Sequence, residues 1–449
     1  MKIRKGLFSA IEKQKKAIHI VLIGTKPDII KQAPLIAELK KRNHFVVVVH
    51  SGQHKQFNLT GGLEEEFSIV PDVNLEVSGN LYEQQSQIIL RLGKLLAQIK
   101  HLKKQIIPYI CADTTTAVAA GIASFANLIS TAHVEAGLRT MSPPKDLILS
   151  LINNSVDIKT YVEELQKPNG WQKGSYEPYP EQFDTRAAGP SVGVHFAPVE
   201  LNAQNLREEG YDPSRIFIVG NTVADVLELV KHTVKKTDVF AQFPALAKGE
   251  LIRFCIHRRE NITSLQRFMA IFEAMEALIK EGRNVVLISL SATEKALVSY
   301  NLKRKTIELA NKYPNFVYSE VLPYYRDTVA IMQKCTLVVT DSGSIQEETN
   351  LLFNSDRPEA VFNGSNVIAP PISKEVILNV IHGLLESDSL LTHMRNAPKL
   401  YGDHVSRKIV RIIEESVEED SSFNIFEFME HQRLGLDKKR FWRKGGIQW

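Results

Sequence analysis

Short apolar runs alternate with segments of helical periodicity along the first half of the chain. A continuous apolar run of strand length is typical of a buried parallel strand, and recurrence every three to four residues is typical of a helix. The pattern predicts strands at His19–Ile23, Phe45–Val49, Ile106–Cys111 and Asn127–Ala132, and helices at Pro27–Lys41, Leu81–Leu102 and Thr114–Ala126. This alternation indicates stacked βαβ units.

Residues 141–177 interrupt that rhythm. Prolines and glycines surround a helical pattern at Leu147–Leu165, and we interpret the segment as an inserted lid or dimer element. At the start of the chain, Ile3–Lys16 is basic and amphipathic. We expect it to dock on its own domain or on a second subunit, with contact to a membrane surface as the alternative.

A second alternating series begins near Arg215. It predicts strands at Ile216–Val219, Leu251–Ile256, Val285–Leu290, Phe316–Tyr318 and Thr336–Thr340, and helices at Thr222–Val234, Ser264–Glu281, Tyr325–Lys334 and Ile345–Leu352. The fold class is therefore α/β, with two doubly wound domains and a ligand cleft between their strand carboxyl ends. We expect an N-terminal domain at 1–214 that carries the 141–177 insert, a C-terminal domain at 215–403, and a returning helix with a tail at 404–449.

Composition narrows the class of protein. A chain of 449 residues is too long for one ordinary core, and 44% hydrophobic with 24% charged residues is typical of a soluble globular protein. A net charge of +4 is too small to indicate nucleic-acid binding. The three cysteines are far apart, without metal-ligand spacing, which suits a reducing cytoplasm. No secretory signal or membrane-spanning run is apparent, so we expect a cytoplasmic protein without stable membrane insertion.

The most specific motif is His-Val-Glu-Ala-Gly-Leu-Arg-Thr at 133–140, directly after a predicted strand. Glu135 and Arg139 there are either site residues or a structural ion pair, since charges at such a place need partners. Gly24-Thr25-Lys26 opens a helix after the first strand and favours an anion, or is simply a turn. Asp113 follows another strand, as a site carboxylate or as part of a helix cap. Residues 180–186 add Glu181 and Arg186, which taken alone look like ordinary surface.

The second series carries phosphate-type motifs after two of its strands. His257-Arg258-Arg259 begins a loop into a helix, where cations suit a phosphate, and the alternative is a solvated charge cluster. Ser342-Gly343-Ser344 precedes a helix whose free amides favour a diphosphate, and Glu348 one turn later can accept from ribose hydroxyls. Arg357 offers one more phosphate contact.

Together these motifs resemble the UDP-N-acetylglucosamine 2-epimerase family, in the family's order from about Ile18 to Glu415. The resemblance implies a GT-B fold of two facing Rossmann-like domains, and inversion at C2 of a UDP-linked N-acetyl sugar through a 2-acetamidoglucal. It also implies a homodimer and no cofactor or metal. By position the family's catalytic residues match Asp113, Glu135, Glu181 and His257, and its substrate contacts match Lys26, Arg139, Arg186, Ser342, Gly343, Ser344, Glu348 and Arg357. Gln53 and His54 match a pair near a regulatory nucleotide-sugar site in bacterial members.

The chain departs from the family pattern at several positions. Lys26 replaces an Arg, Gln182 replaces a Glu, one extra residue precedes Arg186, and about eight residues that include a sheet strand seem absent after Leu352. The 141–177 insert is longer than in the common bacterial enzymes. Three alternatives therefore stay open: a hydrolysing epimerase that releases N-acetylmannosamine and UDP, a GT-B glycosyltransferase, and a non-catalytic nucleotide-sugar sensor.

Overall fold

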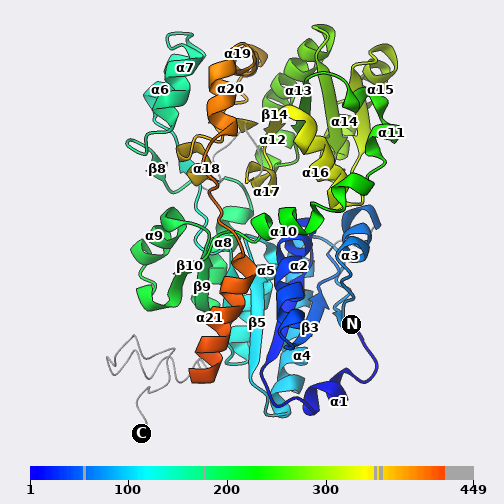
Figure 1. Cartoon of the computed structure of the whole chain (residues 1–449), viewed down its shortest axis with the longest axis vertical. Coiled ribbons are helices and arrows are strands. Elements are labelled where there is room, and N and C mark those ends of the chain that lie inside the picture. The colour runs from blue at the N-terminus through cyan, green and yellow to red at the C-terminus, as the bar shows by residue number, and fades with distance from the viewer. Residues whose placement is uncertain (54–56, 176, 348–350, 353–356, 420–449) are drawn as a thin grey trace. The chain divides into compact units, whose positions relative to one another are not determined.

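The computed structural model describes residues 1–53, 57–175, 177–347, 351–352 and 357–419. The chain divides into two compact units. The first comprises Met1–Leu138, Pro180–Leu229 and the chain from Tyr401, and the second comprises Arg139–Tyr179 and Val230–Leu400. The α/β class with two Rossmann-like units is thus confirmed (Figure 1).

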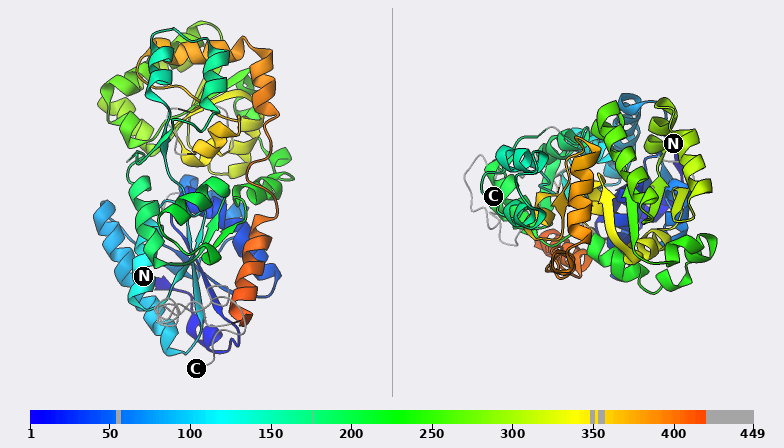
Figure 2. Two further views of the ribbon diagram at one scale, coloured as in Figure 1. Left: turned by 90° about the vertical axis from the view of Figure 1, so that its left-hand side faces the viewer. Right: turned by 90° about the horizontal axis from the view of Figure 1, so that it is seen from above.

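The first unit is built on one sheet with the strand order β1-β4-β3-β2-β5-β6-β9-β10, parallel except for the β1–β4 pair. Its strands are β1 (Lys2–Ile3), β2 (Ile18–Ile23), β3 (Phe45–His50), β4 (Val73–Asn74), β5 (Ile106–Cys111), β6 (Thr131–Val134), β9 (Val192–Ala197) and β10 (Ile216–Ile218). Its helices are α1 (Leu7–Glu12), α2 (Lys26–Lys41), α3 (Gly62–Glu66), α4 (Leu81–His101), α5 (Thr115–Ala126), α8 (Glu181–Ala188), α9 (Glu200–Glu208), α10 (Val223–Val230, at the unit boundary) and α21 (Val405–Glu419). Helices cover both faces of this sheet (Figure 2).

The second unit has the sheet order β13-β12-β11-β14-β15-β16, all parallel. Its strands are β11 (Leu251–Cys255), β12 (Asn284–Ser289), β13 (Phe316–Glu320), β14 (Cys335–Thr340), β15 (Leu351–Leu352) and β16 (Val367–Ile368), beside the hairpin of β7 (Met141–Ser142) and β8 (Gln172–Lys173). Its helices are α6 (Lys145–Ile152), α7 (Ile158–Leu165), α11 (Val239–Gln242), α12 (Arg259–Ile262), α13 (Leu265–Lys280), α14 (Ser291–Ser299), α15 (Lys303–Lys312), α16 (Tyr325–Lys334), α17 (Gly343–Gln346), α18 (Pro358–Phe362), α19 (Lys374–Leu385) and α20 (Asp388–Arg395).

Each sheet has a point where the direction of strand addition reverses. In the first unit β2 and β5 are neighbours, with β3 added on one side and β6 on the other. In the second unit β11 and β14 are neighbours in the same way. Loops that leave such neighbouring strands run to opposite faces of the sheet, and the crevice at their carboxyl ends is where doubly wound folds bind ligands. The residues that follow these four strands are therefore the candidates for contact with a ligand.

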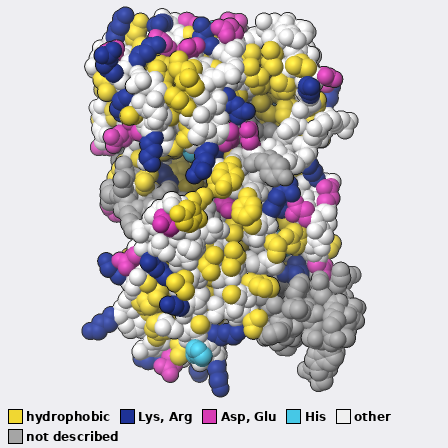
Figure 3. Space-filling model, turned by 180° about the vertical axis from the view of Figure 1, so that it is seen from behind, with side chains coloured by type: hydrophobic (Ala, Val, Ile, Leu, Met, Phe, Trp, Pro, Cys, Tyr) yellow, Lys and Arg dark blue, Asp and Glu magenta, His cyan; other side chains and the backbone are white. Residues whose placement is uncertain are grey.

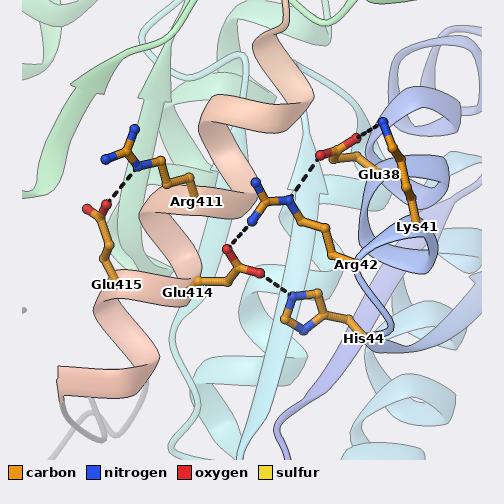
Figure 4. A network of polar contacts seen from close by, with 7 residues as sticks. All are labelled: Glu38, Lys41, Arg42, His44, Arg411, Glu414 and Glu415. Carbon is orange, nitrogen blue, oxygen red and sulfur yellow. Dashed lines mark hydrogen bonds and ion pairs between the residues drawn. The ribbon is translucent and has the colours of Figure 1, made fainter.

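The ends of the first unit close its core. On α1, Leu7 and Ile11 are buried in the main apolar cluster, so this helix docks on its own unit. Helix α21 packs on α2, and Arg42 and His44 both contact the Glu414 carboxylate, with 2.8 Å from His44 Nε2 to Glu414 Oε1 (Figure 4). The C-terminal helix therefore returns to the first unit through both apolar packing and an ion-pair network.

The 141–177 segment belongs to the second unit in the structure, whereas the sequence predicted an insert of the first domain. Its predicted single helix is two helices, α6 and α7. The Tyr161 hydroxyl on α7 is buried and donates a hydrogen bond of 2.9 Å to the Ile368 carbonyl at the end of β16. A partner some two hundred positions away along the chain holds the segment, and local periodicity carries no sign of it.

Two predicted elements near the switch-point strands differ in extent from the structure. The strand expected at Asn127–Ala132 is β6 at Thr131–Val134, because Asn127 caps α5 and Leu128 turns with a φ of 62°. The helix expected at Ile345–Leu352 stops at Gln346, and Leu351–Leu352 form β15 between β14 and β16. The sheet thus keeps a strand where the sequence suggested that one was lost.

Candidate active site

The loop after β2 lies close to residues that follow β3 and β5. Thr25 caps α2 through a reciprocal pair of bonds with Asp28. A Cβ placed on Gly24 would lie 2.3 Å from Ser51 Oγ and 2.6 Å from Thr116 Oγ1, so only glycine fits here. Thr116 Oγ1 in turn donates to Gln53 Oε1 at 2.7 Å. Gln53, predicted as a regulatory residue, is therefore part of this strand-end cluster, whereas His54 lies outside the described residues.

Four carboxyl groups gather at the same edge. Asp113 lies in the tight turn between β5 and α5, where Ala112 has a φ of 54° and accepts a 2.8 Å hydrogen bond from His133 Nε2. Burial raises the pKa of Asp28 to about 6; hydrogen bonds from Thr25 and Thr114 oppose this rise, and the charge of Asp113 adds to it. Asp184 and Glu181 on α8 complete the group.

Asp184 was not among the predicted site residues. It is buried, and its Oδ2 accepts a hydrogen bond of 2.9 Å from Thr115 Oγ1 at the start of α5. Burial raises the pKa of Asp184 to about 7; the Thr115 hydrogen bond lowers it, and the charges of Asp113 and Glu181 raise it further. The edge of the sheet thus holds acids that titrate near neutral pH, which is the property that general acid–base catalysis needs.

Glu135 has a counterion that the sequence did not reveal. The Lys31 ammonium on α2 forms an ion pair with Glu135 Oε2, and both side chains are almost wholly buried. Glu135 is at the end of β6 with a φ of 64°, in the left-handed region that a non-glycine residue adopts at a cost of about 1–3 kcal/mol. The partner in this ion pair is Lys31, whereas the alternative considered from the sequence was an ion pair within the motif, between Glu135 and Arg139.

The other predicted basic residues of this region are placed differently from one another. Lys26 occupies the first position of α2, and Arg139 is buried. Arg186 is exposed on α8, and its Nη1 lies 3.9 Å from Glu209 Oε1. The structure therefore does not place the Arg186 guanidinium among the carboxyl groups.

In the second unit a buried carboxylate organises the switch point. Asp341, at the end of β14, accepts hydrogen bonds from the backbone N–H groups of His257 (2.9 Å) and Arg258 (3.0 Å) after β11. It also accepts from Asn261 Nδ2 at 3.0 Å, and His257 Nδ1 lies 3.3 Å from its Oδ1. The loop that carries His257 is thus anchored on one carboxylate.

That carboxylate also sets the charge of His257. Burial acts to lower the pKa of His257, but the hydrogen bond and negative charge of Asp341, with a further contribution from Cys255, raise it to about 10. Burial likewise acts to raise the pKa of Asp341, and its contacts with His257 and Asn261 outweigh this effect and lower it. His257 is therefore an imidazolium at neutral pH, suited to an anionic ligand.

The remaining phosphate-type residues lie beside this pair. Ser342 follows Asp341, is buried, and donates its N–H to Thr340 Oγ1 at 3.0 Å, while Gly343 and Ser344 open α17. Arg357 is buried, and its Nε donates to Glu347 Oε1 at 2.9 Å. Glu348, predicted to contact a ribose, lies outside the described residues.

The residues that the sequence reasoning missed share one property, which is that their partners are distant in the chain. Lys31 lies on an amphipathic helix, and Asp184 lies on a helix whose sequence is that of ordinary surface. Asp341 lies at the end of a strand, where the sequence analysis predicted a role for the neighbouring Ser342 instead. The one signal that the sequence offered was position: Asp341 directly follows a predicted strand, as Asp113 nearly does.

Among the described residues, no cluster of three or more His, Cys, Asp or Glu is placed to hold a metal ion. Every described helix also falls short of the length and apolar character that a membrane span requires.

Two Rossmann-like units, each with polar residues at its switch point, define a protein of the GT-B class. A family model described as UDP-N-acetylglucosamine 2-epimerase matches residues 37–148 and 173–414. The chain belongs to the UDP-N-acetylglucosamine 2-epimerase family. Residues 149–172, which the family model does not match, fall inside the segment that the sequence predicted as an insert.

Individual relatives agree over most of the chain. The UDP-N-acetylglucosamine 2-epimerase of Salmonella typhimurium is 30% identical over 405 residues, which cover 86% of this chain and 94% of that protein. The crystal structure of the Methanocaldococcus jannaschii UDP-GlcNAc 2-epimerase, in complex with UDP-GlcNAc and UDP, matches with a TM-score of 0.72 at 26% identity, covering 89% of this chain and 99% of that one. The Neisseria meningitidis enzyme bound to UDP-GlcNAc matches with a TM-score of 0.71 at 26% identity, covering 88% and 99%.

Proposed function

We propose that this protein interconverts UDP-N-acetylglucosamine and UDP-N-acetylmannosamine. The proposal rests on the kinds of titratable group that lie at the two switch points. The switch point of the first unit holds a cluster of carboxyl groups, of which Asp28 and Asp184 titrate near neutral pH, and that of the second holds a fixed imidazolium. An elimination at a sugar next to a departing diphosphate needs both kinds of group.

In the proposed reaction a carboxylate of the first unit removes the C2 proton of the sugar. The C1–O bond breaks, and UDP leaves with the bonding electron pair, so that a 2-acetamidoglucal forms between C1 and C2. Re-addition of UDP at C1 and return of a proton to the other face of C2 give the epimer. The step balances without an oxidant or a reductant. Asp113, Glu135 and Glu181 are the proposed acids and bases, and Lys31 keeps Glu135 ionised through its buried ion pair.

The second unit is proposed to hold the UDP part. The His257 imidazolium, which Asp341 maintains, offsets the charge that develops on the diphosphate as it leaves. Gly343 and Ser344 offer N–H groups after β14, and Ser342 and Ser344 offer hydroxyl groups, from which a phosphate oxygen can accept. Arg357 with Glu347, and Arg139 in its buried position, are proposed to support the same ligand.

We also propose a homodimer formed through the first unit. Helix α5 packs against both α4 and α8. These three helices expose Leu90, Ile122, Phe125 and Phe183. Figure 3 shows apolar side chains gathered over part of the surface in the lower half of the view. Such exposed apolar groups on one face favour association. Light scattering should give a dimer mass, and Phe125→Asp should shift it towards the monomer.

The cytoplasm is the proposed compartment, and supply of N-acetylmannosamine units for polysaccharide biosynthesis is the proposed role. Two of the three free cysteines, Cys111 and Cys255, are buried, and the third, Cys335, is partly buried. Isolated buried thiols suit a reducing compartment.

The reaction is tested by incubating the purified protein with UDP-N-acetylglucosamine in deuterated water and recording proton NMR spectra. Deuterium at C2 together with UDP-N-acetylmannosamine is the expected result. Deuterated free sugar with UDP would instead indicate the hydrolysing reaction, and UDP release that depends on an added acceptor would indicate a glycosyltransferase. Glu135→Gln is the matched control, since it should abolish exchange while UDP binding remains.

A further inference from the structure

The Asp184–Thr115 pair lies beside the carboxylates that the proposed function uses. Asp184 projects from α8, and Thr115 from the first turn of α5. The two helices pack against each other, and the Thr115 hydroxyl donates to Asp184 Oδ2 at 2.9 Å. The Asp184 side chain is 3% exposed, so its position is fixed by packing and by this hydrogen bond.

The charges around Asp184 are almost all negative. Asp113, from the turn after β5, and Glu181, from the start of its own helix, both act on it electrostatically. Asp28, from the start of α2, interacts in the same way with Asp113. The neighbouring segments 115–126 and 189–191, all of them described, carry no titratable side chain. Carboxylates this close to one another in a desolvated place do not all ionise at neutral pH.

We propose that Asp184 is a further positioning residue of this site, one that holds a proton at neutral pH. Asp28 and Asp184 are both buried beside threonine hydroxyls, but Asp184 has two anionic neighbours, Asp113 and Glu181, whereas Asp28 has Asp113 alone. As a neutral acid, Asp184 adds no further negative charge beside the carboxyl groups of Asp113 and Glu181. Once ionised, it would repel both carboxylates and the anionic substrate, so turnover would fall.

This inference rests on the proposed epimerase function for its effect on turnover, but not for its effect on protonation. The protonation state is measured on the whole protein without substrate, with 13C-labelled aspartate and NMR over pH 5 to 9. In the wild type we expect one aspartate carboxyl to titrate close to pH 7. In Asp184→Asn that signal should be missing, and in Thr115→Val its midpoint should move to higher pH, because the hydroxyl bond stabilises the ionised form.

Asp403→Asn is the matched control, since it changes an exposed aspartate of the same unit and should leave the titration as in the wild type. The proposal is overturned if no aspartate carboxyl titrates near pH 7 in the wild type, apart from that of Asp28 near pH 6, or if the one near pH 7 survives in Asp184→Asn.

The effect on turnover is read from the pH dependence of kcat for epimerisation. The wild-type rate should fall about tenfold per pH unit above the carboxyl midpoint. The Asp184→Asn rate should stay level over that range, because the amide stays neutral. A falling limb of equal size in both proteins would overturn the positioning role. If neither protein epimerises while the carboxyl titrates as expected, the reaction assignment fails and the protonation assignment stands.

Discussion

Replacement of Asp341 by Asn should convert His257 from a fixed cation into a group that titrates in the neutral range. In the structure the pKa of His257 is about 10, so at pH 7.5 its charged form exceeds the neutral form about 300-fold. The hydrogen bond and charge of Asp341 contribute most to raising this pKa, whereas burial lowers it. Without the carboxylate, the pKa of His257 should fall to its ordinary value or below, and about a tenth or less of the molecules would carry the charge at pH 7.5.

The same substitution also removes a hydrogen-bond acceptor. The carboxylate of Asp341 accepts from the backbone N–H groups of His257 and Arg258 and from Asn261 Nδ2. An amide that keeps Oδ2 as its oxygen leaves all three donors an acceptor at 3.0–3.1 Å, but its NH₂ group replaces Oδ1, so the His257 N–H loses its 2.9 Å bond and the His257 ring its 3.3 Å partner. The cost should be about 1–3 kcal/mol of the free energy of unfolding.

The assay is calorimetric binding of UDP-N-acetylglucosamine at pH 6 and pH 8.5, in a Glu135→Gln background that prevents turnover. With Asp341 intact, the contribution of His257 should be equal at both pH values. In Asp341→Asn the affinity should be about 10–100-fold weaker at pH 8.5, the worth of one charge-assisted hydrogen bond, and should recover in part at pH 6.

Asp327→Asn is the control for loss of a buried aspartate. Asp327 lies on α16 of the same unit, is also buried, and accepts a 2.6 Å bond from Thr237 Oγ1. It should leave the pH dependence of binding unchanged. The reasoning is refuted if the His257 ring still titrates above pH 9 in Asp341→Asn, or if this variant binds as tightly as its parent at pH 8.5.

Three further outcomes are expected. Gly137→Ala should destabilise the first unit much more than Gly210→Ala in thermal unfolding. Both glycines have φ near 85–90°, but a Cβ on Gly137 would lie 2.2 Å from the Asn202 carbonyl oxygen, whereas Gly210 faces open space and its substitution carries only the left-handed strain of about 1–2 kcal/mol. Similar losses of stability in the two variants would contradict the contact at Gly137. Because burial raises the pKa of Asp184 from 3.8 to about 7, ionisation favours the unfolded state, so this group should make stability fall as pH rises from about 4 to 7, and Asp184→Asn should flatten that part of the curve. Tyr161→Phe should cost the second unit about 1–3 kcal/mol in denaturant unfolding, because a buried carbonyl loses its donor, and no change would speak against that bond.

The longer strands, and the polar residues that follow them, could be predicted from the sequence, because buried parallel strands are long apolar runs. Ile106–Cys111 was predicted with its observed bounds, and Asp113 and His257 were found because each follows such a run. Elements shorter than a periodic window were not: β15 has two residues and is a strand only because β14 and β16 pair with it. Strand β9 has six buried residues, but no strand was predicted there, because only the motif at 180–186 that precedes it was interpreted.

The candidate site could be predicted only as far as each residue carries its own signal. A glutamate after a strand indicates a site, but nothing in the sequence says that the lysine at position 31 neutralises it, because the two are 104 positions apart. Likewise the acidity of Asp184 is a property of its burial and of Asp113 and Glu181 nearby. Residue type and spacing therefore found candidates, whereas protonation states needed the three-dimensional neighbours.

The return of α21 to α2 has a consequence for synthesis on the ribosome. Arg42 and its partner Glu414 are 372 positions apart, so at about 5–20 residues per second the first waits roughly 20–75 s for the second to emerge. During that interval the surface of α2 on which α21 later packs is without that helix. Both segments of the second unit, Arg139–Tyr179 and Val230–Leu400, are synthesised before the first unit can close. A chain that ends just before Tyr401 would therefore contain every residue of the second unit and leave apolar surface of the first unit exposed, which makes such chains prone to aggregate.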